Sequence, residues 1–344
     1  MSNSTNETAG SGQYDETILD SSAVSPTDAE GNPIPVTIPI DLAPGIKAIY
    51  TTRLGGLSAG DWGDLNLGGK SGDNPATVKA NRVALAKSVG APLSLVAQVH
   101  SGRAVDVDDF FECNATYGCD FSGTIMDSGN GDGPASYPRL EADAEVTIQK
   151  GIALGMFAAD CLPVLLADPE TGVIAAAHCG RKGLQRGVIG SAAEMMVAKG
   201  AKTERIVATL GPCICGDCYE VGDEIADEFD AQFPGTFTLT RFGGPGIDIA
   251  KAALQELAEA GIPRDNVIDS TPRVGAATQY LDQDAELAAL CASDGEGSPD
   301  LAERIGGVRH SLCTLENPLW YSHRRASLAH KEHEGRLLAL IVRE

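Results

Sequence analysis

The central part of the chain alternates short apolar runs with polar punctuation. Residues 152–159, 163–167 and 173–177 are apolar and rich in small and β-branched side chains, with Gly, Pro and Asp residues between them. Runs of this length predict buried strands rather than helices. The segment Pro169–Gly172 has the proline and the terminal glycine that favour a four-residue reversal. We therefore predict a buried hairpin built from the second and third runs.

The register of this hairpin brings a thiol near an imidazole. If Asp168 pairs with Val173, antiparallel counting places Pro163 opposite His178. Cys161 lies two residues before Pro163 and therefore points to the same face as His178. Such a pair can ligate a metal, can act as a metal-free nucleophilic Cys–His pair, or can be structural, with a buried thiol beside a hydrogen-bonded core histidine.

The remaining pattern predicts an α/β protein. Apolar runs predict further strands at 46–50, 92–99, 205–210 and 337–342, and helical patterns cover 75–88, 188–199, 223–233 and 249–260. The first helix has Asn74 as its N-cap, Pro75 at its first position and Gly90 after its end. No linker divides these elements, so we predict one domain over residues 46–344.

Three segments differ from this pattern. Residues 1–45 are rich in Ser, Thr, Asn and acidic side chains, which predicts a disordered tail with an edge strand at 35–40. Residues 106–140 and 284–307 are rich in Asp, Gly and Ser or in acidic side chains, and we interpret both as surface insertions. Within the first, residues 128–133 resemble a calcium loop, but Arg139 occupies the place of the required glutamate.

Composition limits the choice of partner and compartment. The 344-residue chain has a formal charge of −22, which argues against nucleic acid or an anionic membrane as a general partner. Nine cysteines without a regular framework favour reduced thiols and a cytoplasmic location. We find neither a signal-peptide pattern nor an apolar run of about 18 residues. The sequence carries no prediction of oligomeric state.

Cationic residues nevertheless gather after the hairpin. Residues 180–187, GRKGLQRG, form a basic, glycine-rich turn that leads into a helix, which is a suitable anion site although it matches no phosphate-loop fingerprint. Arg53 at a strand end, and Arg324 with Arg325 beside aromatic residues, are further candidates for anion contacts.

Two other groups of residues have metal-binding chemistry. His100 is alone in its segment, and it matters only if the fold brings it to Cys161 and His178, because three protein ligands and one open position define a catalytic zinc site. Residues 213–218 contain three cysteines, as in a zinc knuckle. No fourth ligand lies at knuckle spacing, so the sequence alone gives little support to a separate structural metal.

Taken in order, these segments resemble the YfiH-like family, long catalogued as multicopper polyphenol oxidases or laccases and now described as zinc-dependent purine nucleoside phosphorylases. The segments that carry the resemblance are TTRLGGLS (51–58), LNLGGKSGD (65–73), Asn81–Arg82, QVHSG (98–102), EADAEVT (141–147), ADCLPVLLADP (159–169), AAAHCGRKGL (175–184), GPCICGDCYEVG (211–222), Cys313–Thr314, YSHRRA (321–326) and Gly335–Arg336. They cover nearly the whole predicted domain.

The resemblance implies a fold, a metal and a reaction. It implies two mixed β-sheets between helical layers, with zinc held by His100, Cys161 and His178. It also implies phosphorolysis of adenosine, inosine, guanosine and methylthioadenosine by inorganic phosphate, together with adenosine deaminase activity. We add the hypothesis that basic side chains hold phosphate or ribose oxygens and that an aspartate orients a ligand histidine or moves a proton. The residues concerned are Arg53, Arg181, Lys182, Arg324, Asp143 and Asp160.

Four other functions remain as alternatives at this point. A metal-free hydrolase would use Cys161 as nucleophile and His178 as base. A peptidoglycan editing factor, a role assigned to some relatives, and a non-catalytic zinc protein are the second and third. Laccase activity fits least, because a multicopper oxidase needs many histidine ligands and this chain has six histidines, so copper is a weaker expectation than zinc.

Overall fold

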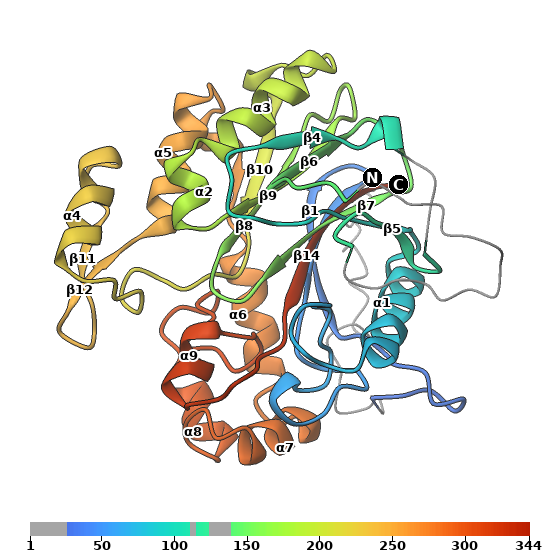
Figure 1. Ribbon diagram of the computed structural model, residues 1–344, viewed down its shortest axis with the longest axis vertical. Helices are drawn as coiled ribbons and strands as arrows, with labels where there is room; N and C mark the ends of the chain where they lie inside the picture. Colours follow the sequence, from blue (N-terminus) through green and yellow to red (C-terminus); the bar gives the residue numbers. More distant parts are fainter. Residues whose placement is uncertain (1–25, 111–114, 124–138) are drawn as a thin grey trace, which may run out of the picture.

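The structure, a computed structural model, describes residues 26–110, 115–123 and 139–344. Within these residues the chain forms two six-stranded sheets and one separate two-stranded hairpin. Figure 1 shows the sheets in the middle of the molecule and helices around them. The predicted α/β class, with two mixed sheets between helical layers, is confirmed.

The first sheet joins both ends of the described chain. Its strands, in spatial order, are β1 (Thr37–Ala43), β2 (Ile46–Thr51), β14 (Leu337–Arg343), β7 (Ala153–Ala158), β3 (Leu93–Leu95) and β5 (Gly118–Asp120). The pairs β1–β2, β2–β14 and β14–β7 are antiparallel, whereas β3 is parallel to both β7 and β5. The C-terminal strand is therefore central to this sheet.

The second sheet contains the predicted hairpin. Its strands, in spatial order, are β13 (Val267–Ile268), β10 (Val207–Leu210), β8 (Leu162–Ala167), β9 (Ile174–Cys179), β6 (Ala144–Thr147) and β4 (Ala104–Asp106). Strands β8 and β9 pair with Pro163 opposite His178, as the hairpin register predicts. The Asp168 N–H donates to the Val173 carbonyl at 2.9 Å, so the turn between them fixes that register.

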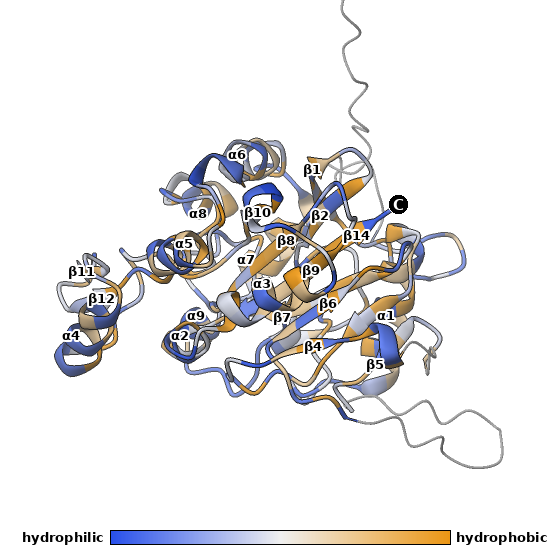
Figure 2. Cartoon of the chain, turned by 90° about the horizontal axis from the view of Figure 1, so that it is seen from above, coloured by the Kyte–Doolittle hydropathy of each residue, from blue (hydrophilic) through white to orange (hydrophobic). Residues whose placement is uncertain are grey.

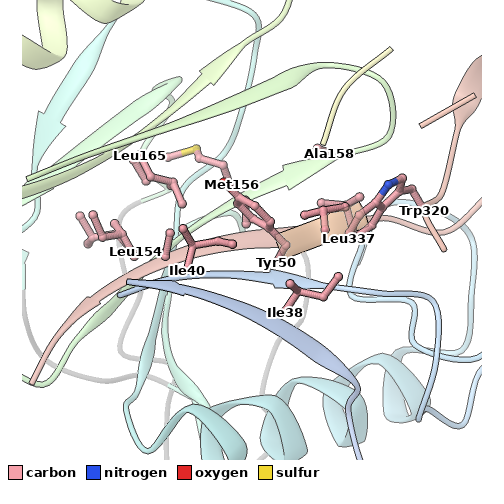
Figure 3. Close-up of a cluster of buried hydrophobic side chains, with 14 of the residues drawn as sticks. Ile38, Ile40, Tyr50, Leu154, Met156, Ala158, Leu165, Trp320 and Leu337 are labelled. Carbon is pink, nitrogen blue, oxygen red and sulfur yellow. The ribbon is translucent and has the colours of Figure 1, made fainter. Parts of the chain in front are cut away.

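Both sheets are covered on both faces, which explains why their strands are apolar at nearly every position. In β14 the side chains of Leu337 and Ile341 join the core between the sheets, whereas Leu338 and Leu340 join a cluster on the outer face of the first sheet. Figure 3 shows part of the core between the sheets, in which Tyr50 and Met156 lie near Leu165 of the opposite sheet.

The helices form the outer layers. They are α1 (Pro75–Val89), α2 (Arg181–Gln185), α3 (Val188–Ala198), α4 (Asp223–Gln232), α5 (Ile249–Glu259), α6 (Thr271–Tyr280), α7 (Ala285–Ser293), α8 (Leu301–Gly306) and α9 (His323–Leu328). Helices α3 and α5 pack on the second sheet and α1 packs on the first. The hairpin of β11 (Phe237–Leu239) and β12 (Pro245–Ile247) lies with α4 at one side of the molecule (Figure 1).

Hydropathy follows this layering. In Figure 2 the strands at the centre are mostly orange, whereas α4, α6 and other outer helices carry more blue. No helix in the described parts of the chain has both the length and the apolar character needed to cross a bilayer.

Helix α1 illustrates how local signals set helix limits. The Asn74 side chain accepts a hydrogen bond from the Ala76 N–H, and Pro75 occupies the first turn. Gly90 ends the helix in the left-handed conformation with φ of 73°, which favours glycine. The predicted helix at 75–88 is thus confirmed to within one residue.

The interpretation of two segments as surface insertions needs correction. Within 106–140, strand β5 pairs with β3, and Cys119 and Phe121 are buried in the core between the sheets. Within 284–307, α7 and α8 contribute Leu287 and Leu301 to the same core. A polar composition misled the prediction because a few apolar residues suffice to anchor each segment. The candidate calcium loop at 128–133 lies outside the described residues.

The start of the ordered domain also needs correction. Strand β1 pairs with β2 along the edge of the first sheet, and its Ile38 and Ile40 side chains are buried. The predicted edge strand at 35–40 is therefore present as Thr37–Ala43. The boundary near residue 46 is too late, because the antiparallel partner of β2 precedes it in the chain. Residues 1–25 lie outside the described residues.

Candidate metal centre and cavity

Three separate segments bring His100, Cys161 and His178 together. His178 lies in β9, Cys161 directly precedes β8, and His100 lies in the loop after β3. The Cys161 Sγ and His100 Nε2 atoms are 3.8 Å apart, and the two imidazole rings meet edge to face with centroids 4.9 Å apart. One potential ligand atom from each residue lies within 4.8 Å of the others.

Asp143 organises this cluster. Its buried carboxylate accepts a hydrogen bond from His178 Nδ1 at 2.8 Å, which leaves Nε2 of that ring to face the cluster. The same carboxylate accepts the N–H groups of His100 at 2.9 Å and Ser101 at 2.5 Å. One side chain therefore orients one ligand ring and shapes the loop that carries the other.

The loop and the turn that carry two of these residues adopt unusual backbone conformations. His100 has φ of 57° and Asp160, next to Cys161, has φ of 90°, a region that non-glycine residues rarely occupy. The Asp160 carboxylate accepts hydrogen bonds from the Thr314 hydroxyl at 2.7 Å and the Arg324 N–H at 2.6 Å. These contacts hold the Asp160–Cys161 turn against the C-terminal segment, and such local strain is typical of functional sites.

The electrostatics favour a thiolate beside imidazole groups. Burial raises the pKa of Cys161, but the charge of His178 and the hydrogen bond from His100 outweigh it and lower that pKa to about 6. Burial lowers the pKa of His178, but the Cys161 thiolate and Asp143 raise it to about 9. Hydrogen bonds from His178 and Ser101 overcome the burial of Asp143 and lower its pKa to about 2. The cluster thus stabilises the deprotonated sulfur that metal binding requires.

The donor set fits a metal ion. A thiolate sulfur and two imidazole nitrogens are suitable ligands for zinc and for other thiophilic transition metals. The hydrogen bond from His178 to Asp143 is the carboxylate support that ligating histidines commonly have. Three protein ligands leave a further coordination position, and the cluster opens into a cavity.

This cavity has a volume of about 560 Å³, and all three cluster residues line it. Its lining includes apolar residues, among them Val96, Ala97, Phe157 and Ala158. It also includes polar and cationic residues, among them Lys70, Tyr219, His323, Arg324 and Arg336. The combination of apolar surface and several cations suits a ligand with an aromatic part and an anionic part.

Three of the four cations predicted to bind an anion do not line the cavity. Arg53 is 1% exposed, and its guanidinium pairs with Asp294 at 3.1 Å and lies over the ring of Tyr321. Arg53 is therefore not placed to contact phosphate in this cavity, because carboxylates between α7 and α8 neutralise it inside the protein. Arg181 bonds to Gln185 within α2, and Lys182 is exposed.

Arg324 is the predicted cation that does line the cavity. Its backbone N–H bonds to Asp160, its side chain donates to the Glu220 carbonyl at 2.8 Å, and its guanidinium lies over the ring of Tyr219. The neighbouring Arg325 is buried and makes structural contacts. Two adjacent arginines of the segment 321–326 thus have different surroundings, one at the cavity and one inside the protein.

Sequence reasoning did not assign roles to Lys70, Tyr219, His323 and Arg336, all of which line the cavity. Each of these residues lies within a segment that carries the family resemblance. Their positions could have marked them as candidates, but only the fold shows that these segments meet around one cavity.

Comparison with known proteins places the chain in a family. Residues 47–282 match the model of the family described as multi-copper polyphenol oxidoreductase laccase. The chain belongs to this family. This match confirms the expected resemblance to the YfiH-like family. The crystal structure of the Bacillus licheniformis hypothetical protein YfiH superimposes on the chain with a TM-score of 0.66. That match covers 93% of this chain and all of the other at 23% identity, and it shows a shared fold.

Curated proteins that are similar in sequence to this chain carry names from nucleoside metabolism. A purine nucleoside phosphorylase of Streptomyces griseus is 43% identical over 216 residues, which are 62% of this chain and 79% of that protein. An adenosine deaminase of an unknown prokaryotic organism is 32% identical over 236 residues, which are 66% of this chain and 83% of that protein. These names support an enzyme of nucleoside metabolism.

Proposed function

We propose that this protein is a zinc-dependent purine nucleoside phosphorylase that accepts adenosine, inosine, guanosine and methylthioadenosine and that also deaminates adenosine. The observation that carries this proposal is the meeting of His100, Cys161 and His178 at a cavity whose lining includes both apolar and cationic residues. The names of the relatives supply the substrate class that we propose, and the mixed lining supports it.

Zinc is the metal that we propose for this centre. Thiolate sulfur and imidazole nitrogen are zinc ligands, and three protein ligands with an open fourth position are the pattern of catalytic zinc sites. The family description refers to copper, but a multicopper oxidase needs several histidine-rich sites. The described residues contain two clusters with the spacing for a metal ion, and the second has no histidine. Bound zinc supplies a Lewis acid that stabilises developing negative charge.

The apolar part of the lining would receive the purine base. Phe157 offers an aromatic ring, and Val96 and Ala158 offer aliphatic surface. Gln98 holds Phe157 in place, because its amide bonds to both the N–H and the carbonyl of Phe157, at 2.7 and 2.8 Å. Apolar and aromatic side chains of this kind bind planar bases by stacking and burial.

The cationic residues of the lining would receive phosphate. His323 and Arg324 reach the cavity from the start of α9, whereas Lys70 and Arg336 reach it from two loops. Guanidinium and ammonium groups bind phosphate through charge-assisted hydrogen bonds, and the chain concentrates them here despite its formal charge of −22. Phosphorolysis forms a bond from a phosphate oxygen to ribose C1′ and breaks the bond from C1′ to the base. The base leaves with that electron pair and takes up a proton.

Deamination of adenosine is a second reaction of the same proposal. Water would replace phosphate as the nucleophile and attack C6 of the base, from which ammonia leaves. The relative named adenosine deaminase favours this reaction. The protein's residues would have the same roles as in phosphorolysis: Asp143 orients His178, and the apolar part of the cavity lining holds the base.

Incubation of the zinc-loaded protein with adenosine, with and without phosphate, tests the proposal. We expect adenine and ribose 1-phosphate only when phosphate is present, and inosine in both cases. Absence of all three products at high enzyme concentration would remove the nucleoside proposal and leave the alternatives, among them the peptidoglycan editing role and the non-catalytic zinc protein. A metal-free hydrolase is excluded if zinc purifies with the protein and Cys161→Ala loses it.

A further inference from the structure

A second group of metal-ligating side chains lies away from the candidate centre. Cys215 and Cys218 are separated by two residues, and so are Cys313 and Glu316. One ligand atom from each of these four side chains lies within 4.8 Å of the others. The sequence offers no fourth ligand near the three cysteines at 213–218, and the structure supplies two from a segment about 100 residues away.

Backbone pairing brings the two segments together. Cys213 and Cys313 form a parallel bridge, in which the Thr314 N–H donates to the Cys213 carbonyl at 3.0 Å. After this bridge, the chain turns at Cys215, whose carbonyl accepts the Cys218 N–H at 2.9 Å. The Cys215 N–H also donates to the Cys313 sulfur at 3.4 Å. Two short turns therefore face each other with their sulfur atoms between them.

Hydrogen bonds hold the Glu316 carboxylate in one orientation, as expected for an ionised metal ligand. Its carboxylate is buried, and one oxygen accepts the N–H groups of Arg309 and His310 at 2.9 and 2.8 Å. The other oxygen accepts from the Arg241 guanidinium at 2.9 Å and from the Cys218 thiol at 3.5 Å. A carboxylate held by two amides and a guanidinium cannot rotate away from the sulfurs, so it is oriented before any ion binds.

We propose that Cys215, Cys218, Cys313 and Glu316 hold a structural zinc ion. Tetrahedral zinc with bonds of about 2.3 Å to sulfur separates its ligand atoms by about 3.8 Å, which is compatible with the observed cluster. Three thiolates and a carboxylate leave no open position, as in structural rather than catalytic sites. Their excess negative charge lies against Arg241, which contacts both the Cys218 sulfur and Glu316.

This ion would brace the candidate catalytic centre. Ile214, next to Cys215, donates its N–H to the Asp160 carbonyl at 3.0 Å. Thr314, next to Cys313, donates its hydroxyl to the Asp160 carboxylate at 2.7 Å. Both segments of the Cys215–Glu316 cluster therefore contact the turn that carries Cys161. A metal that ties the two segments together holds this turn in place without touching substrate.

Metal content of the full-length protein, purified under reducing conditions with zinc present, tests this inference. We expect about two zinc ions per chain in the wild type and about one in Cys218→Ala and in Cys313→Ala. Cys291→Ala, which removes an equally buried thiol in α7, serves as the matched control and should keep both ions. Cys161→Ala should lose only the ion of the candidate catalytic centre, so failure of either site is visible separately.

A second measurement tests the inference even if the cysteine variants do not fold. Cobalt(II) added to the stripped wild type should give the strong visible bands of a tetrahedral, thiolate-rich site, and Glu316→Gln, which keeps all three thiols and nearly the same shape, should shift these bands. About one zinc per chain in the wild type, removed entirely by Cys161→Ala, would overturn the inference. A disulfide between Cys215 and Cys218 in the reduced preparation would also overturn it.

Discussion

Asp143 has the largest structural influence of any single side chain at the candidate metal centre. It fixes the tautomer of His178 by accepting from Nδ1, and it caps the amides of the loop that carries His100. Asp160, which the sequence made an equal candidate for orienting a ligand, instead holds the turn before Cys161. The expected orienting role therefore falls to Asp143.

Asp143→Asn should weaken zinc binding by about 10- to 100-fold, because the amide no longer supports the ligand imidazole as a carboxylate does. Competition with a chromophoric chelator measures the dissociation constant. Asp120→Asn is the matched control, since Asp120 is a buried carboxylate that pairs with Arg82 at 2.9 Å and is not one of the cluster residues. Equal zinc affinity in Asp143→Asn and wild type would contradict the role given to Asp143.

Two adjacent arginines allow an effect on binding to be distinguished from an effect on stability. Arg324 lines the cavity, whereas Arg325 donates to Glu296 at 2.7 Å and to the Trp320 carbonyl at 2.6 Å. Arg324→Ala should raise the KM for phosphate about 10- to 100-fold, because it removes a hydrogen bond between charged groups whose free energy corresponds to a change of this size. The unfolding free energy should change little. Arg325→Ala should lower the unfolding free energy by about 3–5 kcal/mol.

Phosphate-dependent kinetics and urea unfolding of both variants check this contrast. A KM for phosphate that Arg324→Ala leaves unchanged would remove Arg324 from the phosphate site. Arg325→Ala with wild-type stability would show that its buried contacts contribute little.

At the scale of elements, the α7–α8 segment is the clearest departure from expectation. The sequence predicts a peripheral insertion, yet Asp294 at the end of α7 pairs with both Arg53 and Arg304. Glu296 pairs with Arg325 and Lys331, and these ion pairs lower its pKa to about 2. The segment thus neutralises buried cations that would otherwise destabilise the fold.

Asp294→Ala should lower the unfolding free energy by about 3–5 kcal/mol, because it leaves the guanidinium groups of Arg53 and Arg304 buried with one partner fewer. Asp282→Ala, at an exposed position nearby, should change it by less than about 0.5 kcal/mol. Chemical denaturation of the two variants makes the comparison. A similar small effect in both would mean that the segment is peripheral after all.

Strand β6 carries a buried acid that makes stability depend on pH. Burial raises the pKa of Glu145 to about 8, against hydrogen bonds from Ser94 and from the Gly155 N–H. The folded protein therefore keeps a proton that the unfolded chain loses above pH 4.5. Between these two pKa values, unfolding releases a proton, so stability falls as pH rises, by up to about 1.4 kcal/mol per pH unit.

Glu145→Gln should remove this pH dependence. The variant should gain stability relative to wild type as the pH rises from 5 to about 8, and the gain should level off above that pH. Urea unfolding of both proteins at several pH values measures the difference, in which contributions from all other groups cancel. A difference that stays constant with pH would show that Glu145 is ionised in the folded state.

At the scale of the whole molecule, the sequence predicted what local signals determine. The Pro169–Gly172 turn fixes the register of β8 and β9, so the approach of Cys161 to His178 follows from counting. The cap at Asn74 fixes the start of α1. Strand order, by contrast, depends on contacts between distant segments, and no local pattern reveals that β14 lies between β2 and β7.

At the candidate site, too, local signals predict some features, whereas others depend on contacts between distant segments. His100 reaches the cluster because a loop wraps around Asp143, a contact across 43 residues that periodicity does not predict. Arg53 has the residue type of a phosphate ligand, but a carboxylate more than 200 residues away neutralises it. The cavity cations Lys70 and Arg336 come from loops whose meeting is a property of the complete fold.

The proposed zinc-dependent phosphorolysis is tested most directly by the rate at which ribose 1-phosphate forms from adenosine and phosphate as zinc is added back to chelator-stripped protein. We expect the rate to rise with zinc until the centre formed by His100, Cys161 and His178 is filled, and we expect Cys161→Ala to stay inactive at every zinc concentration. Stripped protein that forms the product as fast as loaded protein, or an active Cys161→Ala variant, would contradict this proposal.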